Sequence, residues 1–186
     1  SIQGLGMSGS INFVTPVSDG HGVDVLIGLG AKDDQFEVRS LGLDVVTYIQ
    51  GRGGNDTLDV GKTYRSVANI SGVVAFLGEG DDGGEGDTLN VYGDAPRGSD
   101  PDPLSGGQLS AISITGMGMG TNDHFTTHND RFGADLSVKS PGVYPAAIYY
   151  ANRDVDNNSI HSTVENVNVF LGDNADDFIV DSTYAY

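Results

Sequence analysis

A short unit of turn and strand recurs along this chain, and it constrains the fold more than any other feature. The form is D-x-[FL]-x-V after a glycine-bearing turn, and it occurs at residues 34–38, 56–60, 87–91 and 176–180. The aromatic or leucine position and the valine position point to one face of an extended strand. One such unit cannot bury its apolar face, whereas units stacked in coils bury a continuous core. The pattern therefore predicts an all-β parallel β-solenoid of the β-helix or β-roll type.

A second set of strands is expected between these units. Residues 45–49, 73–77 and 164–171 are rich in Val, Ile, Phe, Tyr and Thr, and we expect them to form the other wall of the solenoid. Helices are not expected, because Gly (28 of 186 residues) and Asp both disfavour helix interiors. Short strands with frequent turns are equally typical of an antiparallel β-sandwich, which is the alternative architecture.

Two stretches of the sequence repeat in the same order. Residues 1–7 match residues 113–119 at five of seven positions, and residues 25–40 match residues 167–182 at seven of sixteen. Two ordered matches indicate an internal duplication. The given residues are then expected to be a piece of a longer array, or a protomer that continues into a neighbour.

The duplication predicts how the chain is organised. The first repeat copy takes residues 1–112, and an incomplete second copy takes residues 113–186. The offset between the matches grows from 112 to 142 residues, so the second copy carries an insertion at about 120–164, expected as a loop or hairpin excursion. Pro, Gly and Ser in residues 94–107 indicate a linker-like loop.

The charge of the chain excludes some classes of partner. The formal net charge is −17, from 22 Asp and 4 Glu against 9 Lys and Arg. Nucleic-acid binding needs clusters of Lys and Arg to contact phosphates, so no nucleic-acid partner is expected. An anionic membrane surface is disfavoured for the same reason, and no apolar run is long enough to insert into a membrane.

One of the glycine-bearing turns matches a known calcium-binding repeat. Residues 51–59 read G-R-G-G-N-D-T-L-D and resemble the nonapeptide G-G-x-G-x-D-x-U-x of the repeats-in-toxin (RTX, hemolysin-type) family, with Arg52 in place of a glycine. Residues 83–89 match with one residue deleted. The chain also resembles repeat modules of very large secreted surface and adhesin proteins. The resemblance implies Ca²⁺ bound between successive turns, with Asp56 and Asp87 as ligands and Asp34 and Asp176 at less complete copies of the motif.

The residue types support calcium independently of the resemblance. Ca²⁺ takes six to eight oxygen ligands, and Gly-rich turns expose carbonyl oxygens beside the short Asp carboxylate. Residues 76–102 carry eight acidic residues, including Asp81 and Asp82, against Arg97 alone. These charges repel one another unless they are screened or bound to metal, so Asp81 and Asp82 are further candidate ligands. The alternative is that Asp favours turns and keeps the protein soluble.

Other candidate sites are weaker. His124 and His128 have the spacing of a metal pair, but the surrounding residues favour a solvated loop over a zinc site. The sequence lacks Cys, H-E-x-x-H and G-x-S-x-G, so these nucleophile and metalloprotease motifs are absent. Glycosylation triplets occur at Asn55, Asn69 and Asn157.

Together these features predict a secreted, non-enzymatic structural module stabilised by Ca²⁺. It would form part of an adhesin, surface layer, sheath or filament, and its ends would contact other copies or adjacent repeats. The alternative is a carbohydrate-active or carbohydrate-binding β-solenoid. It would be either a calcium-dependent polysaccharide lyase with an Arg or Lys base, or a module that binds surface glycans through Tyr144, Tyr149 and Tyr150.

Overall fold

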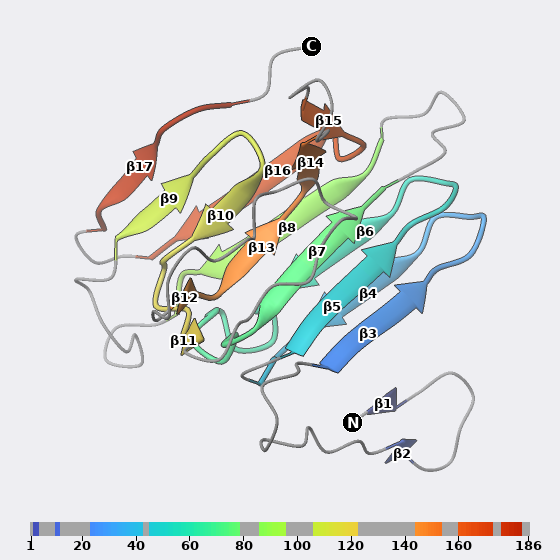
Figure 1. Ribbon diagram of the computed structural model, residues 1–186, viewed down its shortest axis with the longest axis horizontal. Coiled ribbons are helices and arrows are strands. Elements are labelled where there is room, and N and C mark those ends of the chain that lie inside the picture. The colour runs from blue at the N-terminus through green and yellow to red at the C-terminus, as the bar shows by residue number, and fades with distance from the viewer. Residues whose placement is uncertain are drawn as a thin grey trace.

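The computed structural model gives an all-β architecture (Figure 1). It describes residues 2–3, 10–11, 23–42, 45–78, 86–95, 106–122, 144–153, 160–172 and 176–183. Within these residues the chain forms strands and turns and no helix, as the composition predicts. Most of the strands belong to two larger sheets.

The first sheet has four strands, all parallel. Its order is β16 (Asn166–Leu171), β8 (Thr88–Gly93), β6 (Thr57–Val60) and β4 (Gln35–Val38). The register aligns the first three D-x-[FL]-x-V units residue by residue, so that Phe36, Leu58 and Leu89 are neighbours across the sheet. The predicted side-by-side stacking of these three units is therefore confirmed.

The second sheet has seven strands. Its order is β17 (Phe178–Val180), β9 (Gly107–Leu109), β10 (Ser113–Thr115), β13 (Ala147–Tyr149), β7 (Val73–Leu77), β5 (Val45–Gln50) and β3 (Val23–Gly28). Every neighbouring pair is parallel except the two that β10 makes. From β3 to β8 the chain alternates between the two sheets, one strand in each at a time.

Three small antiparallel pairs complete the described strands. They are β1 (Ile2–Gln3) with β2 (Ser10–Ile11), β11 (Thr121–Asn122) with β12 (Tyr144–Pro145), and β14 (Ala151–Arg153) with β15 (Ile160–Ser162).

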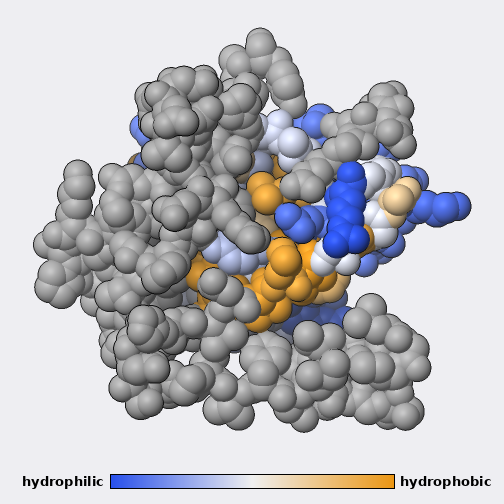
Figure 2. Space-filling model, turned by 45° about the vertical axis from the view of Figure 1, so that its right-hand side comes forward, coloured by the Kyte–Doolittle hydropathy of each residue, from blue (hydrophilic) through white to orange (hydrophobic). Residues whose placement is uncertain are grey.

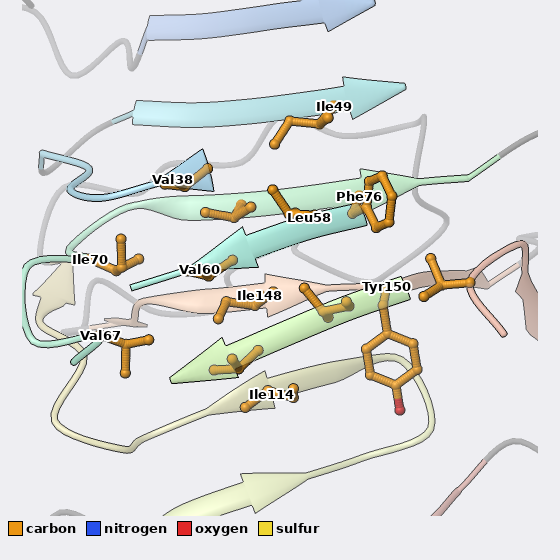
Figure 3. Packing of buried hydrophobic residues seen from close by; sticks show 14 of the residues in the cluster. Val38, Ile49, Leu58, Val60, Val67, Ile70, Phe76, Ile114, Ile148 and Tyr150 are labelled. Carbon is orange, nitrogen blue, oxygen red and sulfur yellow. The ribbon is translucent and has the colours of Figure 1, made fainter. Parts of the chain in front are cut away.

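The main core lies between the two sheets (Figure 3). Ile49 and Phe76 of the seven-stranded sheet pack in one cluster with Leu58, Leu89 and Val91 of the four-stranded sheet, and all five side chains are fully buried. Burial of this apolar surface is the main driving force that holds the two sheets together.

The outer face of β5 and β7 is apolar as well. Val46, Tyr48, Val73 and Ala75 form a second buried cluster there. Figure 2 shows a band of apolar residues near the middle of this view, with strongly hydrophilic residues beside it. Because β5 and β7 are buried on both faces, they read as continuous apolar runs, which is typical of parallel strands.

Two strands lie in the opposite sheet from the one that their patterns predict. Residues 164–171 are expected beside β5 and β7, but β16 pairs with β8 in the four-stranded sheet. Its Val167 and Val169 continue the apolar positions of Leu89 and Val91, so it extends that sheet equally well. The strand of the 176–180 unit is β17, and it pairs with β9 in the seven-stranded sheet.

The segment predicted as an insertion also contributes to the main sheet. Within residues 120–164, β13 lies between β7 and β10, so this part is a sheet strand and not a loop excursion. Much of the remaining insertion, and most of residues 94–107, lie outside the described residues. The division into copies at 1–112 and 113–186 stays a prediction.

Candidate functional site

Acidic residues stand at the start of each strand in the four-stranded sheet. Asp34, Asp56 and Asp87 immediately precede β4, β6 and β8, and Glu165 immediately precedes β16. The parallel register therefore stacks these four residues in one row. We call this row the carboxylate ladder.

Each of the last three carboxylates of the ladder accepts a hydrogen bond from the backbone of the preceding member. The N–H of Asp34 donates to Asp56 Oδ1 at 2.8 Å, that of Asp56 to Asp87 Oδ1 at 2.6 Å, and that of Asp87 to Glu165 Oε2 at 2.6 Å. Asp56 and Asp87 have no exposed surface. Hydrogen bonds to a charged acceptor contribute about 1.5–3 kcal/mol each, so the ladder ties neighbouring strands together beyond their own pairing.

Two glycines leave room for the ladder. A Cβ on Gly51 would overlap Asp56 Oδ2 and would lie 2.8 Å from the carbonyl oxygen of Gly78. A Cβ on Gly78 would overlap Asp87 Oδ2 and the carbonyl oxygen of Thr163. A carboxylate oxygen and a main-chain carbonyl oxygen thus converge beside each glycine. These are the two kinds of hard oxygen ligand that Ca²⁺ takes in proteins, so the donor types fit the predicted ion.

The turn that resembles the calcium-binding nonapeptide keeps a glycine-like backbone. Arg52 has a φ of 80° and Gly54 a φ of 98°, both in the left-handed region. The guanidinium of Arg52 lies against Gly28, which has no side chain to block it. The replacement of a glycine by Arg52 therefore leaves the local conformation of the motif in place.

The predicted ligands are only partly brought together. Asp34, Asp56 and Asp87 share the ladder, whereas Asp176 is exposed and precedes β17 in the other sheet. Asp81 and Asp82 lie outside the described residues. Among the residues that are described, no three His, Asp or Glu side chains are grouped so that they could hold a metal ion.

Glu165 is a member of the ladder that the D-x-[FL]-x-V motif does not predict. The segment 165–169 reads E-N-V-N-V, which follows the unit pattern once Glu replaces Asp and Val replaces Phe or Leu. A wider pattern with any acidic residue and any apolar residue would have found this member of the ladder.

A second polar cluster covers the outer face of the four-stranded sheet. Asp59 of β6 is 1% exposed. It accepts hydrogen bonds from Gln35 Nε2 (3.0 Å), Lys62 Nζ (2.5 Å), Asn90 Nδ2 (3.0 Å) and the Tyr92 hydroxyl (3.2 Å). Four donors around one carboxylate compensate for its removal from water.

Aromatic and cationic groups extend this outer face. The rings of Tyr92 and Phe170 stack with centroids 4.7 Å apart, and the Arg65 guanidinium lies 4.7 Å from the Tyr92 centroid. Arg65 also forms an ion pair with Asp94. These contacts join β8, β16 and the segment after β6, which is a structural role.

The hydrogen bonds around Asp59 are expected to make the free energy of unfolding depend on pH. Burial alone would raise the pKa of Asp59, but the hydrogen bonds from Lys62, Asn90 and Gln35 and the charge of Lys62 lower it below its usual value of 3.8. A lowered folded-state pKa stabilises the protein fully above the unfolded pKa, and this contribution is lost as pH falls through the folded pKa. We expect the unfolding free energies of wild type and Asp59→Asn to differ most above about pH 4 and to converge below it. Urea unfolding at several pH values measures this, and a constant difference would contradict the assignment.

The other residues that the sequence offered as metal-binding or glycosylation sites make different contacts or lie outside the described residues. His124, His128 and Asn157 are outside them. The Asn55 N–H donates to Asp33 Oδ1 at 2.9 Å, within the candidate calcium turn, and Asn69 is exposed in the segment between β6 and β7.

Two of the three tyrosines suggested for glycan stacking are used in packing. Tyr150 is buried in the main core, and its hydroxyl donates to the Ser110 carbonyl. Tyr149 packs against the second cluster, and burial raises its pKa to about 12. The Tyr150 ring is too deeply buried to stack on a sugar, Tyr149 is partly buried, and the side chain of Tyr144 is not described.

Comparison of the chain with protein-family models, curated proteins and solved structures found no match. The described residues also contain no helix long and apolar enough to cross a membrane.

Proposed function

We propose that the chain is a parallel β-solenoid that serves as a structural module and not as a catalyst, secreted and stabilised by Ca²⁺. The observation that carries this proposal is the carboxylate ladder, in which each added strand contributes one acidic residue that binds the backbone of its neighbour. Repetition of one interaction at every strand is a device for extending a scaffold.

The strand connections support the solenoid architecture. Between β3 and β8 each passage of the chain adds one strand to each sheet, always parallel and in register with the previous one. A solenoid requires this alternation. An antiparallel sandwich would pair neighbouring strands in opposite directions, and in the two main sheets only β10 does so.

The convergence of oxygens at the glycines supports calcium. We expect Asp56 Oδ2 with the Gly78 carbonyl, and Asp87 Oδ2 with the Thr163 carbonyl, to supply ligands. A divalent cation would also offset part of the net charge of −17, which otherwise destabilises the compact state. Extracellular modules bind Ca²⁺ with dissociation constants of about 0.1–1 mM, which suits a secreted location.

A thermal melt with and without metal tests the calcium proposal. At 100 times its dissociation constant, Ca²⁺ should add about 2.7 kcal/mol of stability, a rise in Tm of roughly 5–10 °C for a domain of this size. NaCl at matched ionic strength controls for screening and should give a smaller shift. Equal Tm values in excess Ca²⁺ and in chelator would rule out the calcium part of the proposal.

Two matched variants locate the effect. Asp87→Asn keeps an oxygen that can accept the Asp56 N–H but removes the negative charge, so we expect a folded protein that has lost the Ca²⁺-dependent rise in Tm. Asp176→Asn removes the same charge at an exposed position in the other sheet, and we expect it to keep the rise. The reverse result would place the ion away from the ladder.

A further inference from the structure

The seven-stranded sheet has two edge strands that are open among the described residues. β3 pairs only with β5, and β17 pairs only with β9, at opposite ends of the sheet (Figure 1). Both strands expose apolar side chains: Leu26 is 57% exposed, Ile179 56% and Val180 59%. An exposed apolar edge strand is a template for pairing with another chain.

The directions of the two edge strands are compatible with each other. β3, β5, β7 and β13 are parallel, β10 is antiparallel to both β13 and β9, and β17 is parallel to β9. The two reversals cancel, so β17 runs in the same direction as β3. A second copy placed with its β3 against β17 would continue the sheet with parallel pairing.

The faces of the two edge strands also agree. The register from β3 to β13 places Leu26 on the same face as Tyr48, Ala75 and Tyr149. The register from β13 to β17 places Ile179 on that same outer face, because Ile179 pairs through Gln108 and Thr115 with Ala147.

The faces agree only in registers that differ by an even number of residues, and one of these pairs apolar residues with each other. With Leu26 opposite Ile179, Ile27 lies opposite Val180 and Val25 opposite Phe178, so each apolar residue keeps its face. A slip by one residue would place every one of these side chains against the wrong face.

We propose that β17 of one molecule pairs with β3 of a second copy of the same chain, in parallel and with Ile179 opposite Leu26. The contact joins two different surfaces, so each copy keeps one free edge after pairing and further copies add head to tail. This inference rests on the proposed scaffold function, since it names the surfaces through which the scaffold extends.

Charge sets the conditions for this association. Each copy carries a net charge of −17, and the exposed Asp176, Asp177 and Asp181 flank β17. Repulsion between copies is screened by salt. The association constant should therefore rise with NaCl concentration, although pairing itself is made by strand edges and apolar side chains.

Sedimentation analysis of the full chain from about 1 µM to 1 mM tests the proposal. For wild type we expect a mass that increases with concentration beyond that of a dimer. Leu26→Glu and Ile179→Glu each place a negative charge in a contact that aspartates already flank, and each should weaken association about tenfold or more. Tyr64→Glu changes charge equally at a residue that is 55% exposed and belongs to neither edge strand, and it should associate nearly as wild type does.

A mixture of the two edge variants identifies the geometry. Leu26→Glu retains an intact β17 edge and Ile179→Glu an intact β3 edge, so the equimolar mixture should form dimers and stop there. If Leu26→Glu alone associates as well as wild type while Ile179→Glu does not, β17 pairs with β17 and the head-to-tail proposal is wrong. A monomeric wild type at high concentration and high salt would also overturn it.

The outcome is independent of the calcium experiment. The melt with chelator is run at a concentration at which the chain is monomeric, so failure of the calcium proposal and failure of the edge contact give separate results. Far-ultraviolet circular dichroism and Tm of each variant confirm that these exposed substitutions leave the fold intact.

Discussion

Replacement of Phe76 by alanine is expected to lower the free energy of unfolding by about 3–5 kcal/mol. Phe76 is the largest fully buried side chain of the described core, and it packs in the cluster to which both sheets contribute (Figure 3). Its removal loses the transfer energy of the ring and leaves a cavity that the two sheets cannot easily close.

Chemical denaturation at fixed Ca²⁺ concentration measures this loss, and Phe170→Ala is the matched control. Phe170 is 38% exposed and stacks on the outer face against Tyr92, so its truncation should cost about 1 kcal/mol. Equal losses for the two variants would show that the interior between the sheets does not hold them together as described.

Replacement of Gly78 by alanine is expected to cost about 1–3 kcal/mol or more, although it adds a single methyl group. The new Cβ would overlap both Asp87 Oδ2 and the main-chain carbonyl oxygen of Thr163. The Thr163 carbonyl belongs to the backbone, which cannot rotate away as a side chain can. The segment from Thr163 into β16 must therefore shift, and the hydrogen bond from the Asp56 N–H to Asp87 is disturbed.

Gly42→Ala is the control for this substitution. No atom lies within 4 Å of the Cβ it would add, and its φ is not in the left-handed region. Alanine there should be neutral or should stabilise the protein by about 0.4–1 kcal/mol, through a smaller entropy of the unfolded chain. A Gly78→Ala variant as stable as Gly42→Ala would mean that the neighbouring turns are further apart than the ladder requires.

The amino-acid pattern is enough to predict the strand class and the local register of the first three units. Alternation of apolar and polar residues has a period of two only in strands, and an Asp at a constant position before each strand has to stack when those strands pair in parallel. The repeated motif is therefore sufficient to group Asp34, Asp56 and Asp87.

Which distant segment joins each sheet depends on the packing of the folded chain and not on the motif. Glu165 binds a backbone 78 residues away, in the place where the pattern alone would have put another aspartate, and β17 pairs with β9 although it follows the same motif as β4. Backbone groups make the hydrogen bonds at a strand edge, so strands of almost any sequence can pair there. Competition for the edge of β8 is therefore settled by the packing of whole strands, such as Val167 and Val169 of β16 against the core, and not by a local motif.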